Sequence, residues 1–156
     1  MSRAKDIVDR ASAAGVIIAT AESCTGGLIS AAITDVAGSS RVLDRGFVTY
    51  SNAAKMDMLD VSSITLDNHG AVSEQVAAEM AGGALVHSNA ILAVSVTGIA
   101  GPGGSDFKPE GRVCFGIATK HGVETQQLDF GPLGRAGVRS ATVTHALQLL
   151  LEKLPN

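Results

Sequence analysis

Three short apolar runs, each rich in β-branched residues, constrain the fold of this chain more than any other feature. They read VIIAT (residues 16–20), GFVTYS (46–51) and AILAVSV (90–96). Continuous apolar runs are typical of strands that are buried on both faces, as in a parallel sheet. About 25 residues separate the first two runs, which is enough for the crossover that parallel strands require. The runs therefore predict a mostly parallel sheet covered by helices.

Apolar residues at helical spacing predict the helices that accompany these strands. The first apolar stripe ends at Gly15 and consists of Ala4, Ile7, Val8, Ala11 and Ala14. Further helices are predicted over residues 26–37 and 53–60, from the N-cap residue Ser73 to about His87, and along the apolar stripe from Val143 to Leu154.

Two more strands complete the pattern. Residues 112–120 and 123–130 are predicted to pair as a hairpin through His121-Gly122. The order of elements then predicts an α/β fold, a three-layer α/β/α sandwich on a mixed, mostly parallel sheet of about five strands. We expect a single domain over residues 1–156.

Composition and charge exclude several classes of protein. The net charge is −3, aromatic residues make up 3% of the chain and Trp is absent, so neither a basic surface nor a stacking platform for nucleic acid is expected. The N-terminal MSRAKDIVDR lacks the apolar segment of a secretory signal. No apolar stretch approaches the ~20 residues that span a membrane. The two cysteines predict no disulfide framework, and we expect a cytoplasmic protein.

Three polar or glycine-rich segments follow the predicted parallel strands. They are AESCTGG (residues 21–27), TYSNAAK (49–55) and VTGIAGPGG (96–104). In open α/β sheets, ligands bind beyond the carboxyl ends of the strands. If the strands are parallel, the three segments share one edge of the sheet, and this edge is the candidate site.

A nucleophile and a base can be proposed among these segments. Ser23 needs a base to remove its proton, and none of the four histidines lies in the three segments. Lys55 is the one lysine in them, and it could act as the base if burial lowers its pKa. The alternative for Lys55 is an exposed lysine on a helix. Cys24 is an alternative nucleophile, although in an extended segment it would point away from the side that Ser23 faces.

The glycines of these segments have two possible uses. The N–H groups of Gly26 and Gly27 could bind an oxyanion or a phosphate at the start of a helix, and GIAGPGG could form a second backbone cradle. The alternative is that these glycines simply form tight turns. No His or Cys spacing typical of a metal site is present, so no metal is expected.

Four motifs together carry a resemblance to a known family. AESCTGG, GFVTYSNAAKMDMLDV, GAVSEQVAAEMAGGAL and VTGIAGPGGSDFKPEGRVCFGIA resemble the C-terminal domain of the competence/damage-inducible protein CinA. That family includes stand-alone nicotinamide-nucleotide amidohydrolases. The resemblance implies hydrolysis of the amide of nicotinamide mononucleotide to nicotinate mononucleotide and ammonia, in pyridine-nucleotide salvage.

The resemblance also implies roles for individual residues. It makes Ser23 the nucleophile and Lys55 its base, with Tyr50 in the same catalytic site. The substrate-binding residues that it implies are Thr25, Gly26, Gly27, Thr97, Gly98, Gly101, Gly103 and Arg139. Family members often have Gly-Asp-Arg where this chain has Leu133-Gly134-Arg135, so Arg135 could share or replace the role of Arg139 in binding the phosphate.

The resemblance implies no metal or organic cofactor, a small-molecule nucleotide as the ligand, and a homo-oligomer. Two other functions stay open at this point. One is a non-catalytic nucleotide-binding module that uses the same glycine loops. The other is a structural oligomerising domain, favoured by the high Ala and Gly content but leaving the three polar segments unexplained.

Overall fold

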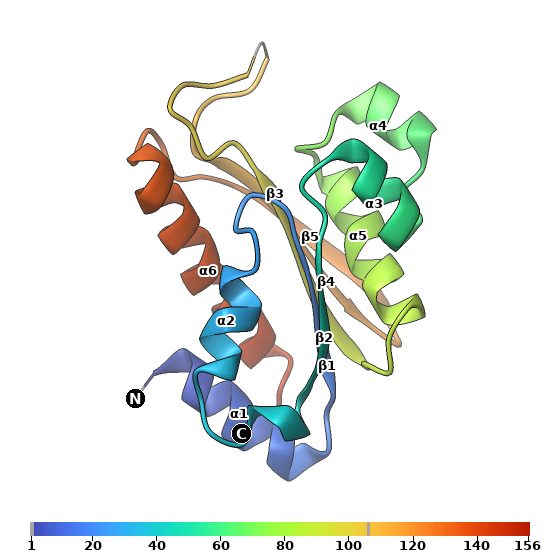
Figure 1. Cartoon of the computed structure of the whole chain (residues 1–156), viewed down its shortest axis with the longest axis vertical. Helices are drawn as coiled ribbons and strands as arrows, with labels where there is room; N and C mark the ends of the chain where they lie inside the picture. The colour runs from blue at the N-terminus through green and yellow to red at the C-terminus, as the bar shows by residue number, and fades with distance from the viewer. Residues whose placement is uncertain (1, 106) are drawn as a thin grey trace.

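The fold is a five-stranded sheet with helices on both faces, as a computed structural model shows for residues 2–105 and 107–156 (Figure 1). The elements along the chain are α1 (Arg3–Ala14), β1 (Ile18–Glu22), α2 (Leu28–Thr34), the 3-10 helix η1 (Ser39–Arg41), β2 (Leu43–Val48), α3 (Asn52–Leu59), α4 (Ser63–His69), α5 (Glu74–Val86), β3 (Leu92–Gly98), β4 (Arg112–Thr119), β5 (Gly122–Asp129) and α6 (Gly134–Glu152).

The sheet is mixed, with strand order β2-β1-β3-β4-β5. Strands β2, β1 and β3 are parallel, whereas β4 is antiparallel to β3 and pairs with β5 as the predicted hairpin. Helices α1, α2 and α6 cover one face, and α3, α4 and α5 lie on the other (Figure 1). The predicted three-layer sandwich is confirmed.

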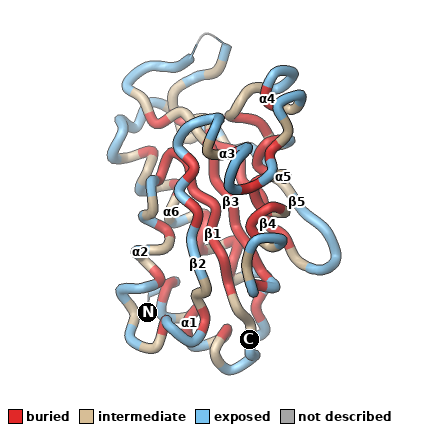
Figure 2. Tube along the Cα trace, turned by 45° about the vertical axis from the view of Figure 1, so that its right-hand side comes forward, coloured by how far each residue is buried: buried red, intermediate tan, exposed pale blue. Residues whose placement is uncertain are grey.

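A separate apolar core fills each side of the sheet. Ile7, Ile29 and Leu150 belong to the core under α1, α2 and α6. Leu59 and Met80 belong to the core under α3, α4 and α5. The central strands are therefore buried along their length, as the red tube of Figure 2 shows, because helices cover both of their faces.

Some predicted details need correction. Helix α4 was not predicted; it is short, and of its seven residues only Leu66 is buried. Ala14, placed in the apolar stripe of the first helix, is exposed. Strand β2 covers residues 43–48 instead of 46–51, and as an edge strand it is only partly buried.

The carboxyl ends of the three parallel strands lie level with one another. Glu22, the last residue of β1, pairs with Val48 of β2 and with Val96 of β3. The segments that follow these strands therefore meet at one edge of the sheet, as the sequence predicted.

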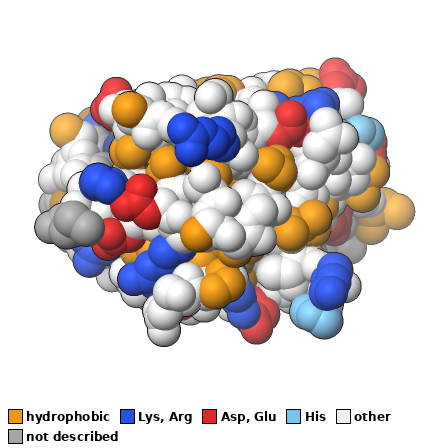
Figure 3. Space-filling model, turned by 90° about the horizontal axis from the view of Figure 1, so that it is seen from below, with side chains coloured by type: hydrophobic (Ala, Val, Ile, Leu, Met, Phe, Trp, Pro, Cys, Tyr) orange, Lys and Arg blue, Asp and Glu red, His pale blue; other side chains and the backbone are white. Residues whose placement is uncertain are grey.

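On the face of the molecule shown in Figure 3, basic and acidic side chains are interspersed, and neither charge forms a continuous patch on that face. Among residues 2–105 and 107–156, no helix has both the length and the apolar character required to cross a membrane.

Candidate active site

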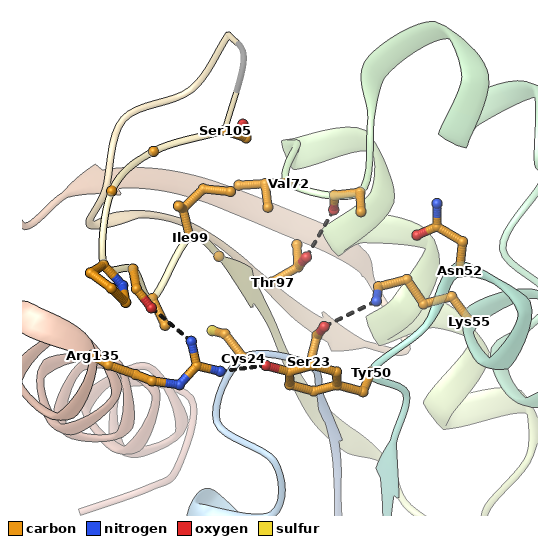
Figure 4. Close-up of a pocket in the computed structure, with 17 residues that line it drawn as sticks. Ser23, Cys24, Tyr50, Asn52, Lys55, Val72, Thr97, Ile99, Ser105 and Arg135 are labelled. Carbon is orange, nitrogen blue, oxygen red and sulfur yellow. Dashed lines mark hydrogen bonds between the residues drawn. The ribbon is translucent and has the colours of Figure 1, made fainter.

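Ser23 and Lys55 form a close pair at the shared edge of the sheet. Lys55 Nζ lies 3.0 Å from Ser23 Oγ, at hydrogen-bonding distance, and it donates a second hydrogen bond of 2.7 Å to the carbonyl oxygen of Thr49 (Figure 4). Ser23 follows β1 directly, and its N–H is held by the Val96 carbonyl of the neighbouring strand. Lys55 belongs to α3, which begins at Asn52, directly after its N-cap residue Ser51. The two side chains that the sequence proposed as nucleophile and base therefore meet.

Lys55 is buried, with 1% of its surface exposed, so it is not the exposed helix lysine of the alternative interpretation. Burial disfavours the charged amine and lowers the pKa of Lys55 below the ordinary lysine value. A smaller influence of Cys24 acts in the opposite direction. A neutral amine can accept the hydroxyl proton of Ser23 while still donating to Thr49. The environment of Lys55 thus favours a general base.

Cys24 lies beside the pair, and both Ser23 and Cys24 line the same cavity. The expectation that only one of them could face the site is wrong, because residues 23–27 form a turn and not an extended segment. We call these residues the nucleophile turn. Burial raises the pKa of the Cys24 thiol to about 11, so the thiol is protonated near neutral pH. The hydroxyl of Ser23 is within hydrogen-bonding distance of the Lys55 amine, and this contact favours Ser23 over the protonated thiol of Cys24 as the nucleophile.

A cavity of about 370 Å³ opens above the Ser23–Lys55 pair. Its wall contains seven of the residues that the sequence proposed for the site: Ser23, Tyr50, Lys55, Thr97, Gly98, Gly101 and Gly103. Thr97 donates a hydrogen bond of 2.8 Å to the Ala71 carbonyl. Gly98 has no room for a larger side chain because its Cβ would lie 2.7 Å from Cγ2 of Val113. Residues after β1, β2 and β3 therefore converge on one cavity.

The two arginines that the sequence could not separate have different surroundings. Arg135, at the start of α6, lines the cavity and donates hydrogen bonds to Tyr50 Oη at 2.6 Å and to the Gly101 carbonyl at 2.7 Å (Figure 4). Arg139, one turn later, is not part of the cavity wall. It donates to the carbonyl oxygens of Cys24 at 3.1 Å and Thr25 at 3.2 Å. Arg135 is the arginine within reach of a ligand in the cavity.

The expectation that the N–H groups of Gly26 and Gly27 are free for an anion needs correction. The N–H of Gly26 donates to the Ser23 carbonyl, and the N–H of Gly27 donates to the carboxylate of Glu22. Both glycines have positive φ angles, 59° and 108°, which fold the chain back toward Glu22. Gly26 and Gly27 therefore form a tight turn, as the alternative interpretation of the sequence predicted. Thr25, Gly26 and Gly27 do not line the cavity.

Sequence reasoning missed other residues of the site. Asn52, Val72, Ile99 and Ser105 also line the cavity. Glu22, immediately before Ser23, is 1% exposed and was not singled out. An acidic residue at the end of a strand buried on both faces was the available signal, because such a carboxylate requires hydrogen-bond donors.

Comparisons with known proteins identify the family of this chain. The family model described as the CinA C-terminal domain matches residues 1–154. A protein of Enterobacter agglomerans named nicotinamide-nucleotide amidohydrolase PncC is 55% identical over 90% of this chain and 87% of its own. A protein of the same name from Escherichia coli K12 is 50% identical over 90% of this chain and 86% of its own. The crystal structure of the competence/damage inducible protein CihA from Agrobacterium tumefaciens has a TM-score of 0.94 and 51% identity, over 96% of this chain and 92% of that one. The chain belongs to the CinA C-terminal domain family.

Proposed function

We propose that this protein hydrolyses the carboxamide of nicotinamide mononucleotide, giving nicotinate mononucleotide and ammonia. The observation that carries the proposal is the contact of 3.0 Å between Ser23 Oγ and the buried amine of Lys55, at the wall of a cavity. The relatives at 50–55% identity that are named nicotinamide-nucleotide amidohydrolase support the choice of substrate.

The first half of the reaction acylates Ser23. The neutral amine of Lys55 takes the hydroxyl proton while Ser23 Oγ bonds to the carboxamide carbon, and the carbonyl electron pair moves onto oxygen. When the tetrahedral intermediate collapses, the C–N bond breaks and the Lys55 ammonium returns the proton to nitrogen, so ammonia leaves. Covalent catalysis of this kind divides one difficult step into two easier ones.

The second half of the reaction releases the acid. Lys55, neutral again, takes a proton from water, and the resulting hydroxide attacks the nicotinoyl ester. The ester C–O bond breaks, and Ser23 recovers its proton from the Lys55 ammonium. The same base thus serves both halves, and burial of its amine matches the need for a base that is neutral near the working pH.

The phosphate of the substrate needs a cationic partner in the cavity. Arg135 lies in the wall beside Tyr50 and Gly101, and its guanidinium can pair with phosphate through two N–H groups. We therefore assign phosphate binding to Arg135, with Thr97 and the glycines at 98, 101 and 103 along the remaining wall.

Ammonia release from nicotinamide mononucleotide tests the proposal. We expect turnover by the intact protein and loss of turnover in a folded Ser23→Ala variant, which still binds the nucleotide in a thermal-shift assay. Activity that survives in Ser23→Ala would contradict the assignment of the nucleophile. Binding without ammonia release by the intact protein would indicate the nucleotide-binding module instead.

Three further expectations from the sequence stay predictions. They are a homo-oligomeric assembly, a cytoplasmic location and the absence of nucleic-acid partners. Light scattering of the purified protein would test the first of these.

A further inference from the structure

The nucleophile turn uses nearly all of its backbone groups internally. From Ser23 to Ser30, six of the eight N–H groups donate to an acceptor within the protein: those of Ser23, Gly26, Gly27, Leu28, Ile29 and Ser30. In the described part of the chain, the N–H of Thr25 has no such acceptor, and the N–H of Cys24 has only the thiol of its own side chain. Of these two residues, Cys24 lines the cavity, whereas Thr25 is fully buried.

Glu22 accounts for three of the six occupied N–H groups. Its Oε1 accepts from the N–H groups of Gly27 at 3.2 Å and Ile29 at 2.9 Å, and its Oε2 accepts from Ser30 at 3.0 Å. Oε1 also accepts from the hydroxyl of Thr25 at 2.5 Å. The carboxylate therefore occupies the start of α2, where the sequence predicted an anionic ligand.

Arg139 holds the turn through its carbonyl groups. It binds the carbonyl oxygens of Cys24 and Thr25, and the Ser23 carbonyl accepts from the N–H of Gly26. In a trans peptide unit the N–H points opposite to the C=O. With the Ser23 carbonyl turned toward the N–H of Gly26, inside the turn, the N–H of Cys24 points away from the inside of the turn.

We propose that Glu22 and Arg139 are positioning residues that hold the nucleophile turn so that the N–H of Cys24, at the cavity wall, receives the oxyanion. The proposal rests on the proposed function. An N–H on the residue that follows a nucleophilic serine is the type of donor that stabilises a tetrahedral intermediate. Arg139 then holds the turn through its hydrogen bonds to the carbonyl groups of Cys24 and Thr25, and it does not bind the substrate phosphate.

Arg135 and Arg139 form a matched pair for the test, because they lie one turn apart on α6 and only Arg135 lines the cavity. The kinetic constants of Arg139→Gln and Arg135→Gln are measured with nicotinamide mononucleotide and with nicotinamide riboside, which lacks the phosphate. We expect Arg139→Gln to lower kcat by about 10- to 100-fold on both substrates equally, since loss of oxyanion contacts acts on the transition state. We expect Arg135→Gln to raise KM for the mononucleotide alone.

The dissociation constant separates positioning from binding. In the Ser23→Ala background, we expect Arg139→Gln to leave the affinity for nicotinamide mononucleotide nearly unchanged and Arg135→Gln to weaken it by about tenfold. If Arg139→Gln weakens binding of the mononucleotide but not of the riboside, Arg139 binds the phosphate and the proposal is wrong.

Glu22 is tested by its conservative variant. Glu22→Gln keeps one acceptor oxygen, so it can retain the bonds to Thr25, Gly27 and Ile29 while losing the bond to Ser30. We expect its kcat to fall less than that of Glu22→Ala, with KM unchanged in both. If the folded Glu22 and Arg139 variants keep the full kcat, the turn needs no such support, and the proposal fails even though the enzyme is active.

Amide hydrogen exchange in the substrate-free protein tests the turn without any turnover. We expect the N–H of Cys24 to exchange faster than those of Gly26, Gly27 and Ile29. Equal protection across the turn would overturn the proposal. Inactivity of the intact protein would instead count against the proposed function, because the exchange pattern does not depend on the reaction.

Discussion

The nucleophile turn and the loop after β3 both follow parallel strands at the same edge of the sheet, yet they are built in opposite ways. In the turn, Ser23, Cys24 and Thr25 are buried, and most backbone groups are hydrogen-bonded within the protein. The loop after β3, residues 99–105 and 107–111, which we call the glycine loop, extends beyond the sheet and is largely exposed (Figures 1 and 2).

The glycine loop is attached at a few points. Lys108 donates to the carbonyl groups of His69 and Val72, and Glu110 accepts from the N–H groups of Gly103 and Gly134. Reacting atoms need positions fixed to fractions of an ångström, whereas a substrate wall must admit and release its ligand. We therefore expect changes near the turn to lower kcat and changes in the glycine loop to raise KM.

Lys55→Met is expected to give the largest effect. It preserves most of the buried volume but removes the group that accepts the proton, so kcat is expected to fall by about 10³-fold or more. Steady-state kinetics on the folded variant measure this loss. Lys153→Met, which removes a lysine of the Glu124 ion pair outside the cavity, is the control. A Lys55→Met variant that loses affinity but keeps kcat would contradict the expectation that changes near the nucleophile turn lower kcat.

Gly83→Ala tests whether α3 must hold Lys55 in place. A Cβ on Gly83 would lie 2.0 Å from the carbonyl oxygen of Leu59, so α3 and α5 would have to separate. We expect a loss of about 1–3 kcal/mol in the free energy of unfolding, together with a lower kcat. Chemical denaturation and kinetics measure the two effects.

The neighbouring Gly82 supplies the control for this variant. A Cβ on Gly82 meets no atom within 4 Å. Gly82→Ala is therefore expected to stabilise the helix by about 0.5–1 kcal/mol and to leave kcat unchanged. Equal behaviour of the two alanine variants would show that the contact between α3 and α5 is not needed to place Lys55.

Gly101→Ala tests the glycine loop. Gly101 has a φ of 88°, and its Cβ would lie 2.6 Å from Cδ of Glu110, the residue that holds Gly103 and Gly134. We expect KM to rise by about tenfold with little change in kcat, because about 1–2 kcal/mol of strain falls on the substrate wall. Gly122→Ala is the control: it has a φ of 124° on the hairpin and no atom near its Cβ. A similar rise in KM in both variants would show that the rise does not come from the contact between residue 101 and Glu110.

The sequence predicted the parts of the fold that depend on local patterns. The apolar runs identified the strands, and the rule for parallel strands placed Ser23, Lys55 and Thr97 at one edge. Helix α4 was missed because its stability depends on tertiary contacts: Glu79 of α5 accepts hydrogen bonds from Ser62 and Thr65. No local pattern contains that information.

The assignments within the site failed where groups compete for the same partner. Gly26 and Gly27 suggested an anion site, but the carboxylate of Glu22 already occupies the start of α2. Arg135 and Arg139 are four positions apart on one helix, and only the contacts of α6 determine which of them reaches the cavity. Periodicity predicts the face of a helix, not the partner that each side chain finds.

The pH dependence of stability gives the smallest expected effect and tests the burial of Lys55 directly. Burial lowers the pKa of Lys55 in the folded protein below its unfolded value of 10.5. Between these two pKa values the unfolded chain binds more protons than the folded protein, so the free energy of unfolding rises with pH. Compared with Lys55→Met, the intact protein should therefore gain stability as the pH approaches 10.5. Lys5, whose pKa is raised by its hydrogen bond to Asp9, should give the opposite slope when compared with Lys5→Met, and its contribution to stability is lost only as the pH rises above 10.5. Urea denaturation between pH 7 and 10.5 measures the Lys55 difference, and the same measurement above pH 10.5 measures that of Lys5. A flat profile for Lys55 would mean that its amine is charged in the folded protein and unsuited to act as the base.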